Sequence, residues 1–180
     1  MNFPVDVQSP PIPYSNGLGS TWGLKATTVL SESARRWTGR GVRIAILDSG
    51  IDFSHPDLAE RIVSAESFVP DCVPQDSVGH GTHCAGIAAG CSDPTGHRYG
   101  IAPDAGLCIG RVLDDTGRTE VPNVIAGIEW AISLGCQVIS MPIGASHDEP
   151  SSEFEAAGWR ALDAGCLVIA SAGNVKSRTV

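Results

Sequence analysis

The sequence of 180 residues lacks the features that mark a membrane protein or a secreted one. It holds no apolar run of about eighteen residues, which is the length that a bilayer-spanning helix requires, so we expect no such helix. Its first residues, Met-Asn-Phe-Pro-Val-Asp, have neither the basic start nor the apolar stretch of a secretion signal. We therefore expect a cytoplasmic protein, or one whose export information lies outside this sequence.

Positive charge is also scarce. Twelve Lys and Arg residues stand against twenty Asp and Glu residues, the net charge is −8, and only 18% of all residues are charged. Such an acidic and lightly charged chain is a poor partner for nucleic acid or for an anionic membrane. Because 42% of its residues are hydrophobic, the chain fits one compact globular domain or a large piece of a bigger one.

A Cys-x-x-Cys pair is absent, which disfavours a structural zinc site. Cys108, Cys136 and Cys166 lie in or beside apolar runs, where a free thiol acts as a small hydrophobic group. Cys72 and Cys91 lie in loop-like sequence. They are the one pair for which a disulfide stays open, because the geometry of such a bridge cannot be read from sequence.

Internal repeats, low-complexity tracts and signs of a second domain are absent as well. Residues 1–20 are rich in Pro, Ser, Gly and Asn, and this composition predicts an extended arm. We place the arm at residues 1–21 and a single domain at residues 22–180.

Strand and helix patterns alternate after the arm. The predicted strands cover residues 42–47, 62–65, 107–113, 137–141 and 166–170, and the predicted helices cover residues 25–37, 80–89, 121–133 and 151–164. Because the strands are near-continuous apolar runs, helices should cover both of their faces. The expected fold is therefore α/β, an open parallel sheet with helices on both faces. Gly135 and Gly165 stand where two of the helices should end.

Two residues suggest acid–base chemistry at the carboxyl ends of this sheet, where ligands bind in such folds. Asp48 follows the first strand, and His80 opens a glycine-rich helix 32 residues later. Singly, Asp48 fits a turn aspartate, and His80 with His83 fits helix-start histidines or two metal ligands without an evident third. Together, a buried carboxylate beside a histidine fixes the tautomer of the ring and stabilises the imidazolium formed during proton transfer.

A third element is the apolar strand that ends in Ala-Gly-Asn at residues 172–174. Asn174 would present a side-chain amide at the edge of the sheet, where a developing oxyanion could be held. Alternatively, it is an asparagine that tolerates a left-handed turn.

Three segments, in this order, resemble those of the subtilases, the subtilisin-like serine proteases. They are residues 46–58 (Ile-Leu-Asp-Ser-Gly-Ile-Asp-Phe-Ser-His-Pro-Asp-Leu), 79–86 (Gly-His-Gly-Thr-His-Cys-Ala-Gly) and 172–174. The resemblance runs from about residue 22 to residue 174 and covers only the first part of a subtilase catalytic domain. It implies a subtilisin-like fold that is incomplete at its carboxyl end, in which Asp48 is the triad acid, His80 the general base and Asn174 the oxyanion donor.

The resemblance implies further roles. His83 matches a structural histidine, Cys84 matches the thiol that the proteinase K branch places beneath the catalytic histidine, and Asp57 matches a ligand of structural calcium. No cofactor is implied for the chemistry. The substrate would be a polypeptide, which pairs with an edge segment and enters a specificity pocket. The edge segment is Gly117, Arg118 and Thr119, and the pocket wall is Pro142, Ile143 and Gly144, where the family usually has Ser-Leu-Gly.

The nucleophile is the main departure from the family. Subtilases carry it in Gly-Thr-Ser-Met-Ala, and this segment does not occur in the sequence. Ser49, Ser140 and Ser171 belong to other motifs, and none lies in Gly-x-Ser-x-Gly. We expect a serine endopeptidase whose serine-bearing part is missing from this chain, so that the chain alone is inactive.

A second interpretation stays open, namely a catalytically silent pseudoprotease that binds peptides or a partner protein. An incomplete sheet would also leave an open edge through which the chain could self-associate. A dinucleotide-binding fold is disfavoured, because Gly39 and Gly41 precede the first strand and no Gly-x-Gly-x-x-Gly follows it.

Overall fold

The computed structural model describes residues 21–31, 36–91, 98–144 and 151–172. Its helices are α1 (Trp22–Ala26), α2 (His80–Ala89), α3 (Val121–Ser133) and α4 (Ser152–Asp163), with a short 3₁₀ helix η1 (Ala59–Arg61). Its strands are β1 (Arg43–Asp48), β2 (Ile62–Ser67), β3 (Gly106–Arg111), β4 (Val138–Met141) and β5 (Leu167–Ala170). The predicted arm lies outside the described residues except for residue 21.

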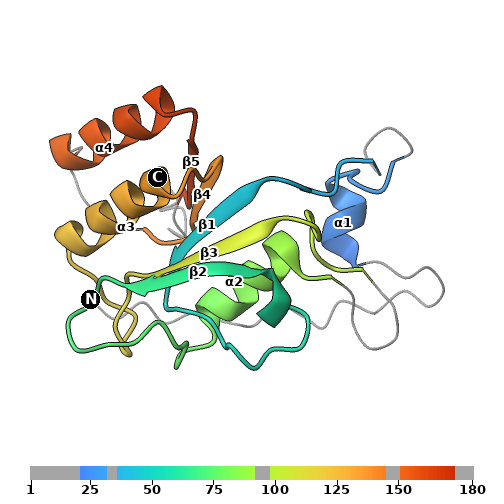
Figure 1. Ribbon diagram of the computed structural model, residues 1–180, viewed down its shortest axis with the longest axis horizontal. Helices are drawn as coiled ribbons and strands as arrows, with labels where there is room; N and C mark the ends of the chain where they lie inside the picture. The colour runs from blue at the N-terminus through green and yellow to red at the C-terminus, as the bar shows by residue number, and fades with distance from the viewer. Residues whose placement is uncertain (1–20, 32–35, 92–97, 145–150, 173–180) are drawn as a thin grey trace, which may run out of the picture.

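The five strands form one sheet in the order β2-β3-β1-β4-β5, and every neighbouring pair is parallel (Figure 1). The predicted α/β fold with an open parallel sheet is therefore confirmed. β1 lies between β3 and β4, so the segments that follow these three strands meet at one edge of the sheet. This placement brings distant parts of the sequence together around the end of β1.

Helices cover both faces of the sheet, because alternate side chains of each strand point to opposite faces. Ala45 and Leu47 of β1 belong to a core with α3 and α4, whereas Ile46 belongs to a second core with α2. Figure 1 shows α2 on one side of the sheet and α3 and α4 on the other. Full burial of each large apolar side chain contributes roughly 1.5–3 kcal/mol, so both cores hold β1 firmly in place.

The helix predicted at residues 25–37 is wrong, because α1 ends at Ala26. The hydroxyl of Thr27 donates a hydrogen bond to the carbonyl of Gly23 at 2.8 Å. Thr28 then adopts a φ of 55°, a left-handed conformation that a β-branched residue rarely takes and that ends the helix. The other three predicted helices agree with the structure to within one residue. Gly135 and Gly165 follow α3 and α4 at positive φ, as predicted.

The described residues cover one face of the sheet incompletely. β5 is an edge strand among the described residues, and the side chains of Leu167 and Ile169 are 54% and 51% exposed. Val168 points the other way and packs against the core of α3 and α4. The uncovered apolar side chains of β5 are therefore on the face of the sheet that carries α2.

The described helices are short. None has both the length and the apolar character that it would need to cross a lipid bilayer.

Candidate active site

Asp48 is the last residue of β1, and it is fully buried. Its backbone carbonyl accepts hydrogen bonds from the N–H groups of Val112 and Leu113, which follow β3. Its carboxylate oxygen Oδ1 accepts a hydrogen bond of 2.7 Å from the N–H of Ser49. The main chain and the carboxylate are both fixed, so β1 presents a rigid acid at the edge of the sheet.

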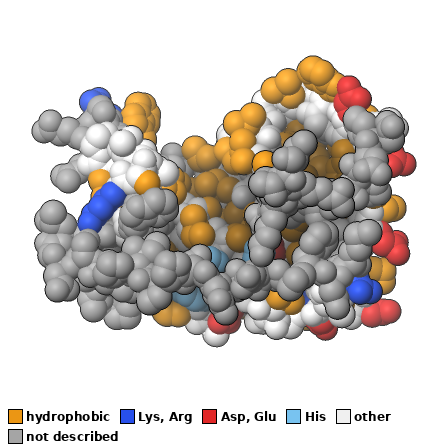
Figure 2. All heavy atoms as spheres, turned by 180° about the vertical axis from the view of Figure 1, so that it is seen from behind, with side chains coloured by type: hydrophobic (Ala, Val, Ile, Leu, Met, Phe, Trp, Pro, Cys, Tyr) orange, Lys and Arg blue, Asp and Glu red, His pale blue; other side chains and the backbone are white. Residues whose placement is uncertain are grey.

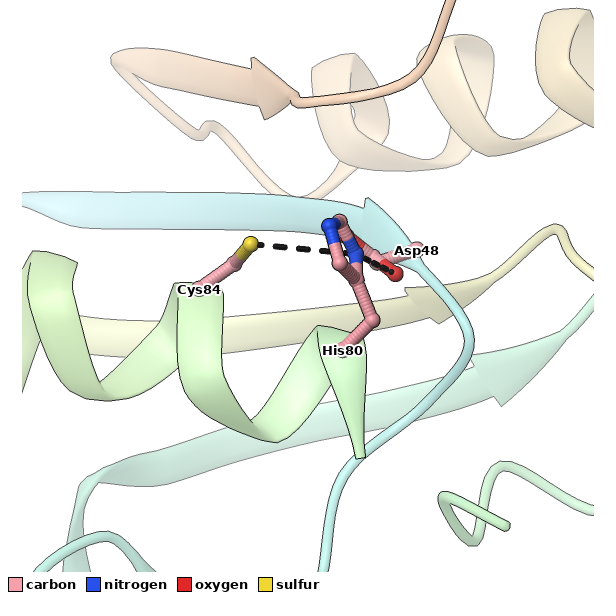
Figure 3. A group of neighbouring side chains, drawn as sticks. All are labelled: Asp48, His80 and Cys84. Atoms are coloured by element: carbon pink, nitrogen blue, oxygen red, sulfur yellow. Dashed lines mark hydrogen bonds and ion pairs between the residues drawn. The ribbon is translucent and has the colours of Figure 1, made fainter. Parts of the chain in front are cut away.

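His80 is the first residue of α2, and its ring lies against this acid (Figure 3). The Nδ1 atom is 2.8 Å from both Oδ1 and Oδ2 of Asp48. The His80 side chain is 43% exposed and the Asp48 side chain 1%. A buried carboxylate favours the tautomer that carries the proton on Nδ1, so that Nε2 is left as the basic nitrogen. The structure thus brings together the two residues that were predicted to touch.

The start of α2 fits closely onto the end of β1. Gly79 precedes the helix at a φ of 91° and has no side chain to cap it. The N–H of Gly81 therefore donates to the hydroxyl of Ser49 at 2.9 Å. A Cβ on Gly81 would lie 2.3 Å from the carbonyl oxygen of Gly50 and 3.2 Å from Cβ of Asp48. Only glycine permits this approach, and the approach places His80 over Asp48.

Sequence reasoning missed Asp76, which holds the same helix start from the other side. Its carboxylate accepts hydrogen bonds from Ser49 Oγ at 2.9 Å, from the N–H of Gly79 at 2.8 Å and from the N–H and hydroxyl of Thr82 at 2.9 and 2.6 Å. Partial burial raises the pKa of Asp76, but the hydrogen bonds from Thr82, Gly79 and Ser49 outweigh it and hold the pKa at about 2. An acidic residue just ahead of a helix start is the signal that could have found it.

Cys84 lies one turn along α2 from His80, with its sulfur 3.9 Å from Nδ1 (Figure 3). Burial, and then the negative charges of Asp48 and Asp76, raise the pKa of this thiol to about 12. Asp48, His80 and Cys84 are the one group of three metal-type ligands in the described part of the chain. Because metals bind the thiolate and this thiol is strongly held in its neutral form, the donor set is not a ready metal site.

His83 does not join His80. It lines a separate hollow of about 490 Å³, together with His55, Asp57 and Tyr99. The spacing of His80 and His83 left open that they bind one metal ion together. The described residues do not support this, because His83 belongs to no group of metal-type ligands among them.

Among the described residues, the surroundings of Asp57 do not form a suitable calcium site. Calcium takes six to eight oxygen ligands, of which several are usually carboxylates. Asp57 is the only carboxylate that lines the hollow, and the hydroxyl of Tyr99 donates a hydrogen bond of 2.8 Å to its Oδ2. The carboxylate that the family resemblance assigns to calcium thus accepts a hydrogen bond from the phenol of Tyr99.

The predicted substrate edge follows β3. Asp114 and Arg118 close a turn, in which the N–H of Asp114 donates to the Arg118 carbonyl and the N–H of Arg118 donates to the Asp114 carboxylate. Both backbone groups of Arg118 are used within the turn, and the N–H of Gly117 donates to the carbonyl of Asp114 at 3.0 Å. An added peptide strand would therefore have to pair with the carbonyl of Gly117 and with Thr119. Arg118 and Thr119 also line a hollow of about 420 Å³.

The predicted pocket wall follows β4. Pro142 and Ile143 are partly buried, and Ile143 packs against the core of α3 and α4. The neighbouring strand β5 ends beside this segment, since the N–H of Ser171 donates to the carbonyl of Met141 at 3.3 Å. Because β1 lies between β3 and β4, the two predicted substrate segments flank Asp48 on both sides.

Asn174 lies outside the described residues. Ser49 is fully buried, and its hydroxyl is engaged with Asp76 and Gly81, so it is not free to act as a nucleophile. Cys72 and Cys91 are both free thiols, and the disulfide that the sequence left open does not form in the structure.

The face of the molecule seen from behind is hollowed. Histidine side chains lie low in this depression, and hydrophobic side chains lie above them (Figure 2).

Comparisons with known proteins agree with this geometry. A profile of the subtilase family matches residues 39–180. Thermitase of Thermoactinomyces vulgaris is 41% identical over 137 residues, which are 76% of this chain and 48% of that protein. Subtilisin E of Bacillus subtilis (strain 168) is 39% identical over 155 residues, which are 85% of this chain and 39% of that protein. Subtilisin BL of Lederbergia lenta is 38% identical over 154 residues, which are 85% of this chain and 55% of that protein. The chain thus spans about half the length of the curated relatives that it matches.

Proposed function

The chain belongs to the subtilase family, and on this premise we propose that Asp48 and His80 are the acid and the base of a serine endopeptidase that hydrolyses peptide bonds. The observation that carries the proposal is the contact of His80 Nδ1 with both oxygens of the buried Asp48, at 2.8 Å. This contact leaves Nε2 on the exposed ring to accept a proton.

The proposed reaction is acyl transfer in two steps. Nε2 of His80 takes the proton of a serine hydroxyl while the serine oxygen attacks the peptide carbonyl, and the imidazolium then protonates the leaving amine. Water, activated in the same way, hydrolyses the acyl-enzyme. Asp48 stays ionised throughout and stabilises the imidazolium. The amide of Asn174 would donate a hydrogen bond to the oxyanion of the tetrahedral intermediate.

The serine of this triad lies outside the printed sequence, which contains no Gly-Thr-Ser-Met-Ala segment. We therefore propose that a polypeptide of residues 1–180 alone does not hydrolyse peptides. Base and acid have no hydroxyl to activate, since Ser49 is buried and bonded to Asp76. The activity belongs to a protein that also carries the serine-bearing part.

Peptide binding is proposed at the two segments that flank Asp48. An extended substrate would pair with the backbone of Gly117 and Thr119 and would pass the wall formed by Pro142, Ile143 and Gly144. Proline has no backbone N–H, so Pro142 offers this strand only its carbonyl. These segments set where a peptide bond would stand relative to His80.

A second candidate is a catalytically silent module that binds peptides or a partner protein. It would use the same two segments beside Asp48, which in this proposal bind a peptide whether or not the peptide is then cleaved. Self-association would use β5, which is an edge strand among the described residues and on which Leu167 and Ile169 are about half exposed.

The reading frame beyond codon 180 separates the two candidates. A continuation into Gly-Thr-Ser favours the protease, and the full product should then hydrolyse casein and react with a fluorophosphonate probe. Replacing His80 by Ala should lower both by several orders of magnitude. A full product that contains the segment and is inactive against casein and peptide esters would overturn the proposed protease.

A further inference from the structure

Arg111 is the one buried cation among the described residues, and the proposed chemistry does not use it. It is the last residue of β3, and its side chain is 4% exposed. The Nε atom donates to the carbonyl of Leu113 at 3.1 Å, and Nη1 donates to the carbonyls of Val73 and Gln75 at 3.0 and 2.8 Å. The Nη2 atom lies 2.6 Å from Oδ1 of Asp115. Four acceptors from two parts of the chain, residues 73–75 and 113–115, thus converge on one guanidinium.

Arg111 lies directly beside the acid of the site. It pairs with Asp48 in the register of β1 and β3, so both side chains start from the same face of the sheet, the face that carries α2. From there the guanidinium reaches residues 73–75, which lie just ahead of α2. Arg111 in the sheet is thereby hydrogen-bonded to the loop that precedes His80.

The loop that Arg111 holds also pairs with the chain after β1. The N–H of Ile51 donates to the carbonyl of Pro74 at 3.0 Å, and the N–H of Asp76 donates to the carbonyl of Ile51 at 2.9 Å. This segment ends in Asp76, whose carboxylate binds the first turn of α2 through Thr82. A continuous set of hydrogen bonds therefore runs from Arg111 to the helix that begins with His80.

Stability alone does not account for an arginine at this position. A cation loses most of its hydration when it is buried, and apolar residues of similar volume often replace buried ion pairs without loss of stability. The ion-pair partner of Arg111 is Asp115, which is 69% exposed and therefore weakens the pair by its contact with water. What the arginine provides is five N–H donors in a fixed geometry, of which those on Nη1 bind the loop carbonyls of Val73 and Gln75.

We propose that Arg111 is a positioning residue, which sets the place of His80 over Asp48 by fixing residues 73–76. The inference rests on the proposed role of the Asp48–His80 pair. Arg111 acts through the loop and does not touch the reacting atoms. Loss of its donors releases the loop, and the start of α2 then moves relative to β1.

The test replaces Arg111 by Met, which keeps an unbranched apolar stem and removes every donor, and by Lys, which keeps the charge and three donors. The readout is the exchange with water of the His80 Nδ1 proton, measured by NMR on the chain of residues 1–180. We expect exchange about tenfold faster in Arg111→Met, where the hydrogen bond to Asp48 opens more often, and an intermediate rate in Arg111→Lys. Arg160→Met is the matched control, because Arg160 pairs with Glu129 on the surface of α3 and α4, and its rate should equal that of the wild type.

A folded Arg111→Met variant with the wild-type exchange rate would overturn the inference. If that variant does not fold, Arg111→Lys decides, because it keeps the buried charge and loses the fork of donors that binds Val73 and Gln75. We expect faster exchange of the His80 proton in a folded Arg111→Lys variant, whereas a rate equal to that of the wild type again refutes the inference. Since the measurement needs no peptide hydrolysis, a full product without protease activity would overturn the proposed function and leave this result standing.

Discussion

The hydroxyl of Tyr99 donates a hydrogen bond of 2.8 Å to Oδ2 of Asp57. The ring reaches this point by lying across a glycine at the end of α2, because a Cβ on Gly90 would stand 2.0 Å from Cε2 of Tyr99. This hydrogen bond thus links the segment that follows α2 to the loop that follows β1. The acceptor, Asp57, is the residue that would bind calcium according to the family resemblance.

Replacing Tyr99 by Phe should lower the free energy of unfolding by about 1 kcal/mol, the net contribution of one hydrogen bond to a carboxylate that is partly exposed. Urea unfolding followed by circular dichroism measures this loss. Because a single carboxylate lines the hollow in the described part of the chain, millimolar calcium should leave the melting temperatures of both the wild type and the variant unchanged. A melting temperature of the wild type that rises with calcium concentration would contradict this prediction.

Acid should destabilise the chain partly through Asp76. The folded-state pKa of this group is about 2, below its ordinary value of 3.8. A carboxyl with a lowered pKa contributes stability that is fully present above its unfolded pKa and is lost as the pH falls toward the folded pKa. The window for Asp76 therefore runs from about pH 4 down to about pH 2.

The measurement is the free energy of unfolding of Asp76→Asn and of the wild type at several pH values in this window. The variant should be less stable than the wild type at neutral pH, and the difference should shrink below pH 4. Asp104→Asn is the control, since Asp104 also has a lowered pKa but lies near Thr38 and Arg40, away from the site. A difference that stays constant down to pH 2 would show that the charge of Asp76 is not what binds the helix start.

The strands of this fold could be predicted from the sequence because each is a buried apolar run, and the α/β class followed from their alternation with helices. The order of the strands could not be predicted, since apolar runs do not say which strand lies next to which. The error at residues 25–37 has a local cause. Thr27 and Thr28 look tolerable in a helical pattern, but the hydroxyl of Thr27 binds back to the helix and Thr28 leaves the helical region.

The contact of Asp48 with His80 could be anticipated because each residue stands at the end of an apolar element and beside glycine. The residues that hold this pair in place were not anticipated. Asp76 and Arg111 act through hydrogen bonds to loop backbone and to residues that are distant in sequence, and such partners leave no periodic pattern. For Arg111 the sequence gives no signal beyond a charge at the end of an apolar strand.

Fluorophosphonate probes should not label the polypeptide of residues 1–180. These probes react with a serine whose proton is taken by a positioned histidine. Ser49 is the serine nearest to Asp48 in sequence, and it is buried and bonded to Asp76. Intact-mass spectrometry after incubation measures the outcome, with subtilisin E as the labelled control. Stoichiometric labelling of any serine in this chain would refute the assignment of the nucleophile to another segment.

Self-association should depend on the edge strand β5. Leu167 and Ile169 present half-exposed apolar side chains on a strand that has no outer neighbour in the described part of the sheet, so two copies can join through this strand. Replacing both residues by Lys should shift the sedimentation profile toward the monomer, because charged side chains on an edge strand oppose pairing. Val63→Lys is the control, since Val63 is 54% exposed on β2 at the opposite edge of the sheet. A wild-type chain that sediments as a monomer at high concentration would contradict the prediction.

Replacing Gly81 by Ala should disrupt the contact between Asp48 and His80. The new Cβ would lie 2.3 Å from the carbonyl oxygen of Gly50 and 3.2 Å from Cβ of Asp48, so α2 has to move away from β1. We expect a loss of about 2–3 kcal/mol in the free energy of unfolding, as in overpacked cores. The His80 Nδ1 proton should also exchange with water faster than in the wild type, as NMR would show.

Gly158→Ala is the matched control, because Gly158 lies inside α4 with nothing within 4 Å of its Cβ position. There the methyl group should raise stability by about 0.5–1 kcal/mol, the gain of Ala over Gly in a helix. Equal effects of the two substitutions would mean that the close approach of α2 to β1 does not set the geometry of the Asp48–His80 pair.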